Sequence, residues 1–142
     1  MLYTRNDLNV IKDEIEFIDT AIIPVVDIDM DSISVTRAEQ IEFIQLIIMM
    51  LEKQLKGRLL ITPLFTVVGE DVTPLNIYKN QLKEYGFKHS IILSFKNRTI
   101  NDAPLIRMNH VPISDMDKDI LEAMVKEEMT KVLKEIIRIW NS

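Results

Sequence analysis

The sequence has 142 residues, of which 47% are hydrophobic and 27% are charged, and its formal net charge is −5. This length and composition predict a single globular domain over residues 1–142. The chain contains no cysteine, three glycines and two histidines. The lack of cysteine excludes thiolate catalysis, zinc–thiolate sites and disulfides, and the scarcity of glycine and histidine argues against glycine-rich phosphate loops and histidine-rich metal sites.

The negative charge is concentrated near the N-terminus. Residues 1–40 carry nine acidic and three basic residues, whereas the other 102 carry thirteen acidic and fourteen basic residues. An acidic chain is poorly suited to phosphate backbones, so we expect no nucleic-acid partner. There is no basic-then-apolar signal peptide, and no uncharged stretch approaches the roughly 18 residues of a membrane helix. We therefore expect a cytoplasmic protein that does not enter a membrane.

Hydrophobic spacing predicts eight elements. Apolar residues three or four positions apart indicate helices, and short β-branched runs indicate strands. The order α-β-α-β-α-β-β-α predicts an α/β domain with three α-β-α layers and a small mixed, mostly parallel sheet of about four strands. In chain order, these are a helix over 6–19, a strand over 21–28, a helix over 36–56, an extended run over 58–68, a helix over 74–85, strands over 89–95 and 105–111, and a helix over 115–140.

Helix starts have local signals as well. Asn6 is predicted to cap the first helix. Thr36 with Glu39 and Ser114 with Asp117 have the spacing of capping boxes, which predicts that the second and last helices begin there.

Two prolines interrupt strand-like runs. Because a proline cannot donate a ladder hydrogen bond, we expect Pro24 and Pro63 each to mark a bulge or a strand end. The run over 105–111 alternates apolar and polar residues, which predicts an edge strand antiparallel to the strand over 89–95.

The second helix carries more apolar residues than one buried face needs. Met49 lies within its polar stripe and Leu46 at the edge of that stripe. Either the helix is covered on nearly all sides, or these two residues contribute to a subunit contact. Self-association through this helix or through the edge strand over 105–111 is therefore one interpretation.

The sharpest chemical feature is Asp27, Asp29 and Asp31, which follow an apolar strand at two-residue spacing. In an extended chain the three carboxylates lie on one side, where Mg²⁺ or Ca²⁺ would relieve their repulsion. The segment is superficially similar to the DxDx[ST/V] loop of haloacid-dehalogenase-type phosphatases, although Asp31 departs from that pattern. An EF-hand is excluded because Ser32 and Ala38 replace its glycine and glutamate. The alternative is a solvated turn before a helix.

The remaining candidates are two histidines and a group of cations. His89 and His110 would approach each other if their strands formed a hairpin, although structural histidines are the commoner case. The same hairpin would be modestly basic and could hold a phosphate-bearing ligand. Its cations are Lys88, Lys96, Arg98 and Arg107, opposed by Asp102.

Three segments resemble the YpiF-like family of small uncharacterised cytoplasmic proteins of Bacillus and its relatives. They are EFIDTAIIPVVD (16–27), LEKQLKGRLLITPLFT (51–66) and LKEYGFKHSIILS (82–94), in the same order. The resemblance implies a cytoplasmic protein of a Gram-positive bacterium. It supplies no catalytic motif to transfer.

The sequence thus favours a non-enzymatic interaction or accessory domain, with a homo-oligomer or another protein as partner and no cofactor. The alternative is a metal-dependent phosphatase or nucleotide-binding enzyme that uses Mg²⁺ or Ca²⁺ at Asp27, Asp29 and Asp31.

Overall fold

The computed structural model describes residues 1–100, 102–112 and 115–142. Its order of helices and strands confirms the predicted α/β domain, with the extended run over 58–68 divided into two strands. Within these described ranges, no helix is long and apolar enough to cross a membrane. The elements are α1 (Arg5–Glu14), β1 (Thr20–Asp27), α2 (Ser34–Gln54), β2 (Leu59–Ile61), β3 (Phe65–Val67), α3 (Thr73–Tyr85), β4 (His89–Ser94), β5 (Leu105–Arg107) and α4 (Lys118–Trp140).

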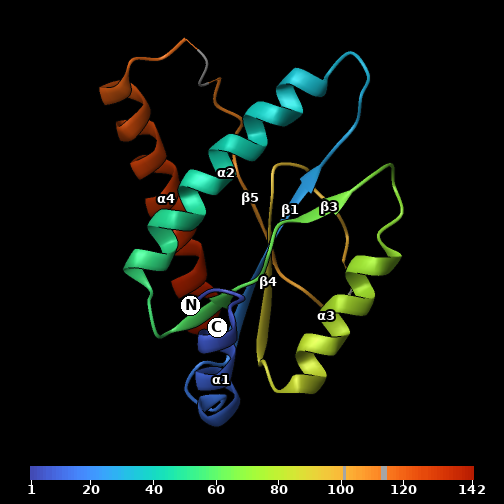
Figure 1. The fold of residues 1–142 in the computed structure, drawn as a ribbon, viewed down its shortest axis with the longest axis vertical. Coiled ribbons are helices and arrows are strands. Elements are labelled where there is room, and N and C mark those ends of the chain that lie inside the picture. Colours follow the sequence, from blue (N-terminus) through green and yellow to red (C-terminus); the bar gives the residue numbers. More distant parts are fainter. Residues whose placement is uncertain (101, 113–114) are drawn as a thin grey trace.

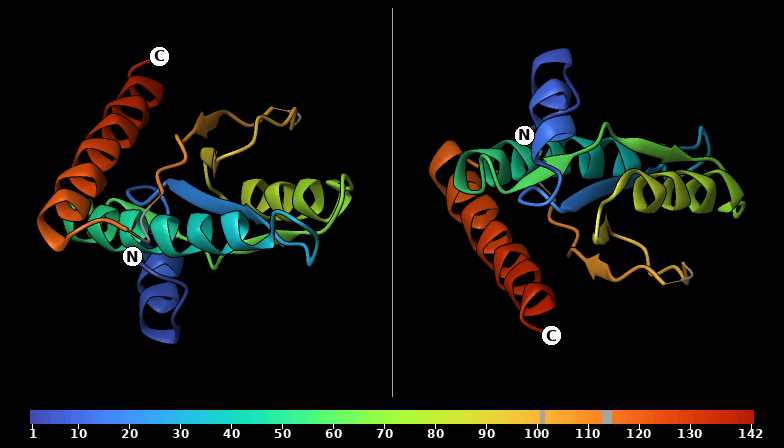
Figure 2. Two further views of the ribbon diagram at one scale, coloured as in Figure 1. Left: turned by 90° about the horizontal axis from the view of Figure 1, so that it is seen from above. Right: turned by 90° about the horizontal axis from the view of Figure 1, so that it is seen from below.

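Helices cover both faces of the sheet, which gives three layers (Figures 1 and 2). Side chains of a strand alternate between the two faces. Ile22 and Val26 of β1 accordingly join the core beneath α2 and α4, whereas Ile23 and Val25 join the core beneath α1 and α3. The buried Thr20 hydroxyl accepts a 2.8 Å hydrogen bond from the indole of Trp140, which ties the end of α4 to the sheet.

The sheet has four strand positions in the order β2-β1-β4-β5, and β3 continues the edge position of β2 beside β1. All the pairings between these strands are parallel. The prediction that the run over 105–111 is antiparallel to its predecessor is therefore wrong. Leu105 pairs with Ile92 and β5 runs in the same direction as β4, whereas the alternation over 105–111 predicted an edge strand without specifying its direction.

The two prolines act together at the edge of the sheet. Ile22 pairs with Ile61 and Val25 pairs with Phe65, so the edge position contains one extra residue around Pro63. Pro63 therefore lies at the predicted bulge between two strands. Pro24, by contrast, lies inside β1, so the prediction of a bulge or strand end there is wrong. The Ile22 carbonyl accepts a hydrogen bond from the Thr62 N–H, so the backbone groups of Ile22 point toward the edge strand. Backbone groups two residues apart in a strand point in the same direction. The position where Pro24 lacks an N–H donor therefore faces the break in the edge strand.

Helix starts differ from their local signals. Thr4, rather than Asn6, caps α1 by accepting from the Asp7 N–H at 3.2 Å. The N-cap of α2 is Ile33, which provides no side-chain cap, so the predicted start at Thr36 is wrong. Asp117 itself caps α4 by accepting from the Ile120 N–H. The other half of that predicted capping box, Ser114, lies outside the described residues.

Gly86 ends α3 with φ of +127°, a conformation that L side chains rarely adopt. A Cβ at this position would lie 2.9 Å from Ile15 Cγ1. We expect Gly86→Ala to lower the free energy of unfolding by more than about 1 kcal/mol, because it adds a contact clash to backbone strain. Gly57→Ala is the matched control, since Gly57 also has positive φ but no atom near its missing Cβ. Equal losses for the two variants in urea unfolding would contradict the role of the Ile15 contact.

Candidate functional site

The carboxyl edge of the sheet is the first place to look for a site. In open α/β sheets, ligands bind outside the carboxyl ends of strands where neighbouring connections leave on opposite faces. Here α2 connects β1 to β2 on one face and α3 connects β3 to β4 on the other (Figure 1). The switch point therefore lies between β1 and β4. Six charged residues gather around this edge, and we term them the carboxyl-edge cluster: Asp27, Asp29, Arg37, Glu70, Lys96 and Arg98.

Asp27 and Arg98 form the most buried ion pair of the cluster. Their side chains are 12% and 5% exposed, and an Arg98 Nη2 hydrogen donates to the Asp27 carboxylate. The pair joins the last residue of β1 to the loop after β4, 71 residues further along the chain. Among buried side-chain atoms of the described residues, Arg98 Nε and Asp29 Oδ1 lack a hydrogen-bond partner. The Asp27–Arg98 ion pair fixes the loop after β4 against β1.

The three predicted metal ligands have separate partners. Arg37 Nε lies 3.4 Å from an Asp29 oxygen, while the exposed Asp31 carboxylate accepts a 2.9 Å hydrogen bond from the Ile33 N–H before α2. The part of the chain that the structure describes holds no group of three or more His, Cys, Asp or Glu residues placed to hold a metal ion. The metal site at Asp27, Asp29 and Asp31 stays a prediction.

The third pair of the cluster is exposed and joins the loops after β3 and β4. Lys96 donates to Glu70 at 2.9 Å, and this hydrogen bond lowers the pKa of the Glu70 carboxyl. The Ser94 hydroxyl donates to the Lys96 carbonyl at 2.9 Å, which shapes the turn that follows β4. Each cation of the carboxyl-edge cluster thus faces an anion. Two of the pairs connect the loop after β4 to β1 and to the loop after β3, and the third connects the loop after β1 to α2.

The predicted basic hairpin does not form, because β4 and β5 are parallel. His89 begins β4 and His110 follows the end of β5, so the two histidines lie toward opposite ends of the sheet. Lys96 and Arg98 are neutralised by Glu70 and Asp27. The prediction that these residues share a hairpin is therefore wrong.

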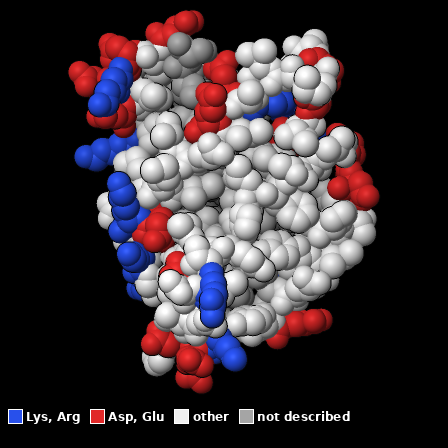
Figure 3. Space-filling view, viewed as in Figure 1, with Lys and Arg blue, Asp and Glu red and all other residues white. Residues whose placement is uncertain are grey.

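A second candidate functional site is a surface that the sequence did not predict. Figure 3 shows a broad area free of Lys, Arg, Asp and Glu, in the region where β2, β3, α3 and the flank of α2 lie in Figure 1. Two adjoining hollows of about 490 and 510 Å³ share Tyr3, Pro63 and Leu64. Their fifteen lining residues contain no charged side chain, and we term them the uncharged face: residues 2–4, Gln45, Ile48, Met49, residues 61–65, Pro74, Ile77, Tyr78 and Gln81.

Apolar side chains stand exposed on the uncharged face. Met49 is 58% exposed, and Tyr3 and Ile77 are each 54% exposed. The rings of Phe65 and Tyr78 stack with their centroids 6.0 Å apart. Burial raises the pKa of the Tyr78 hydroxyl above its usual value.

Two local signals pointed toward this surface. Met49 interrupts the polar stripe of its helix and lies here, so α2 is not covered on all sides. Ile77 is likewise apolar but lies off the stripe of Leu75 and Leu82, which are buried. The other contributions come from the break at Pro63 and from the chain before α1, and a one-dimensional pattern does not show that these segments meet.

We expect Asp27→Asn to lower the free energy of unfolding by about 3–5 kcal/mol, because it leaves the buried Arg98 charge without a partner. Glu135→Gln is the matched control, since its pair with Arg138 is exposed and should contribute less than about 1 kcal/mol. Urea unfolding measures both variants. The double variant Asp27→Leu/Arg98→Met should recover most of the loss, and similar losses for Asp27→Asn and Glu135→Gln would contradict the structural role of the pair.

The metal hypothesis is tested by thermal unfolding with and without Mg²⁺ or Ca²⁺. Since Asp27 and Asp29 already face arginines, we expect neither ion to raise the Tm of the wild type or of Asp29→Asn. A rise in the wild type that Asp29→Asn abolishes would instead establish a metal site.

Comparison with known proteins supports the resemblance drawn from residues 16–27, 51–66 and 82–94. The chain is 28% identical over 132 residues to "Uncharacterized protein YpiF" of Bacillus subtilis (strain 168), a match that covers 89% of each chain. No solved structure gives a significant match. Residues 9–140 match the family described as "Protein of unknown function (DUF2487)", and the chain therefore belongs to that family.

Proposed function

We propose that this protein is a non-enzymatic interaction module that forms a homodimer through the uncharged face. The observation that carries the proposal is the composition of this face: fifteen residues from four segments contribute no charge, although 27% of the chain is charged. Exposed apolar patches rimmed by polar residues are typical of protein–protein contacts.

Charge favours a second copy as the partner. A two-fold dimer brings the same patch of both subunits together. Copies of a chain with net charge −5 repel one another, but the uncharged face meets its own copy without burying an unpaired charge. Met49, which with Leu46 was one of the two residues that the sequence offered for a subunit contact, lies within this face.

The size of the uncharged face is compatible with a dimer. A standard interface uses roughly 20–30 residues from each partner. The fifteen lining residues supply a large part of that number before rim residues are counted, and the neighbouring Val68 is 71% exposed.

The backbone at the edge of the sheet offers a specific contact. Leu2 bridges to Ile61, and the Ile61 N–H donates outward to Met1, so the N-terminal residues cover β2. Among the described strands, β3 pairs with β1 alone, so its other edge is open at Thr66. An open edge strand readily pairs with another strand, and a two-fold axis would place β3 antiparallel to β3 of the second copy.

The Bacillus subtilis relative supports a Gram-positive source for the protein. The cytoplasmic location remains part of this proposal, to be checked by cell fractionation.

We expect Ile77→Arg to convert the dimer into a monomer, because it places a charge within the buried contact. Light scattering after size-exclusion chromatography measures the mass, and circular dichroism checks that the fold is retained. Ile137→Arg is the matched control: Ile137 is 43% exposed on α4, away from the uncharged face. We expect this control to stay dimeric.

A wild-type protein that remains monomeric at high concentration would overturn the homodimer. Dissociation of Ile137→Arg but not of Ile77→Arg would place the dimer contact elsewhere.

A further inference from the structure

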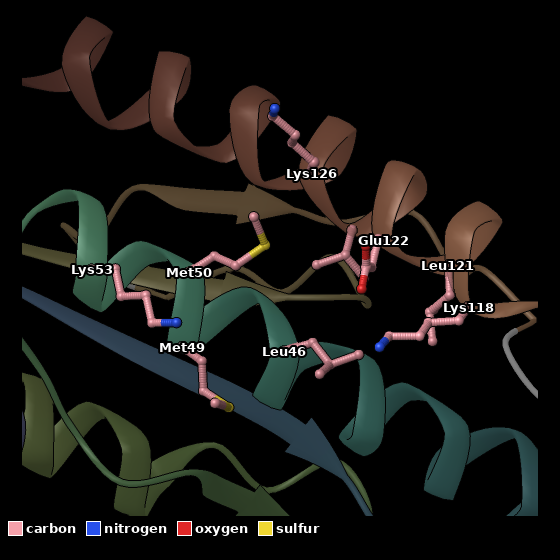
Figure 4. A pocket seen from close by; sticks show the side chains of 9 residues that line it. Leu46, Met49, Met50, Lys53, Lys118, Leu121, Glu122 and Lys126 are labelled. Atoms are coloured by element: carbon pink, nitrogen blue, oxygen red, sulfur yellow. The ribbon is translucent and has the colours of Figure 1, made fainter.

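A groove between α2 and α4 shares Met49 with the uncharged face and differs from that face in charge. We term it the α2–α4 groove, and its volume is about 470 Å³ (Figure 4). Small-molecule sites have volumes of roughly 300–1,000 Å³ and occur between packed helices. The groove therefore has the size of a ligand site.

Its floor is apolar and comes from both helices. Its apolar lining consists of Leu46, Met49 and Met50 of α2 with Leu121 and Val125 of α4. Figure 4 shows the groove from close by. Methionine has an unbranched, flexible side chain that adapts to the shape of its contact. Such a floor suits a flexible hydrocarbon chain.

Its rim is mainly basic. Lys53 of α2 and Lys118 and Lys126 of α4 line the groove with a single acidic residue, Glu122. The ammonium groups of Lys53 and Lys118 lie toward opposite ends of the groove (Figure 4). Along the flank where α4 and the C-terminal half of α2 lie in Figure 1, Figure 3 shows Lys and Arg side chains interspersed with acidic ones.

These lysines are available to a ligand. Among the residues that the structure describes, the ion pairs use other cations, and neither Lys53 nor Lys118 lies within 4.0 Å of a carboxylate. Three lysines and one glutamate line the groove, so its lining carries a net positive charge. The complementary ligand is therefore an anion.

We propose that the α2–α4 groove binds a small anionic amphiphile: one unbranched hydrocarbon tail with a carboxylate or phosphate head. The tail lies on Leu46, Met50 and Leu121, and the head pairs with Lys53 or Lys118 at an end of the groove. The basic rim disfavours contact between this groove and the same groove of a second copy, because the lysines of the two copies would repel each other.

The length of the groove distinguishes this ligand from a docked helix. The α2 side runs from Leu46 to Lys53, which corresponds to about 10 Å of helix, or two turns. Isolated helices shorter than roughly 12–15 residues are marginally stable in water. A hydrocarbon chain of medium length can occupy a groove two helical turns long without having to fold into a helix.

Isothermal titration calorimetry with dodecanoate, below the concentration at which it forms micelles, tests the proposal. We expect dodecanoate to bind, and dodecyltrimethylammonium, which has the same tail and the opposite charge, to bind at least about tenfold more weakly. The double variant Lys53→Glu/Lys118→Glu should weaken dodecanoate binding by about tenfold or more. Lys134→Glu, on α4 outside the groove, should change it less than about twofold.

A second variant tests the apolar floor separately. Leu121 is only partly buried, so Leu121→Asp should retain the fold by circular dichroism while abolishing dodecanoate binding. Retained binding in this variant would overturn the site.

Other occupants give different results. Absence of dodecanoate binding, or equal binding of the cationic analogue, would overturn the proposal. Co-sedimentation with phosphatidylglycerol vesicles without binding of free dodecanoate would assign the basic rim to a membrane surface instead. Loss of the dimer in Lys53→Glu/Lys118→Glu by light scattering would assign the groove to a second copy.

Discussion

Pro24 imposes the constraint from which the shape of this protein follows. It removes one donor from the middle of β1, the central strand that pairs with β2, β3 and β4. A continuous edge strand would place a backbone carbonyl opposite Pro24, where no N–H is available to donate to it. The edge strand is instead broken around Pro63. Pro63 also lacks an N–H donor, but its backbone position, like that of Ile61, faces away from β1. The break leaves β3 as a short open strand and the hollows of the uncharged face beside it.

The two ends of this arrangement have opposite electrostatic character. At the carboxyl edge, where α/β sheets commonly hold ligands, the Asp27–Arg98 pair and its neighbours match each cation with an anion and tie loops to β1. At the broken edge, the fifteen residues that line the uncharged face carry no charged side chain, and apolar side chains are exposed. Charge thus stabilises the connections between strands, while the uncharged face is the surface that we propose for a contact between molecules. The α2–α4 groove is a third environment, with an apolar floor and a basic rim.

The sequence predicted the layers and the element order because both depend on short-range periodicity. The sequences of α2, α3 and α4 repeat apolar residues at helical spacing, and the sequences of the strands are rich in β-branched residues. It did not predict the direction of β5, since parallel neighbours normally need a crossover of a dozen or more residues, while here ten residues separate β4 from β5. The capping signal at Asn6 failed because Thr4, another local capping residue, accepts from the Asp7 N–H instead. The signal at Thr36 failed because α2 already begins after Ile33, which provides no side-chain cap.

The candidate sites were predictable in part, for the same reason. Met49 was recognisable from α2 alone because it interrupts a polar stripe. The Asp27–Arg98 pair was not, because the two residues are 71 positions apart and no local pattern links them. The reading of Asp27, Asp29 and Asp31 as a group treated the chain as extended, whereas Asp31 belongs to the turn before α2. The uncharged face required four segments to be brought together in space.

The homodimer through β3 is the central claim, and pulsed electron paramagnetic resonance tests it directly. The chain has no cysteine, so Thr66→Cys carries a single nitroxide label per molecule, on an exposed side chain that leaves the backbone edge free. We expect one narrow and short distance between the labels, because in the proposed dimer β3 of each copy lies next to the two-fold axis. A labelled protein that shows no coupling between labels at concentrations where light scattering reports a dimer would contradict the homodimer through β3.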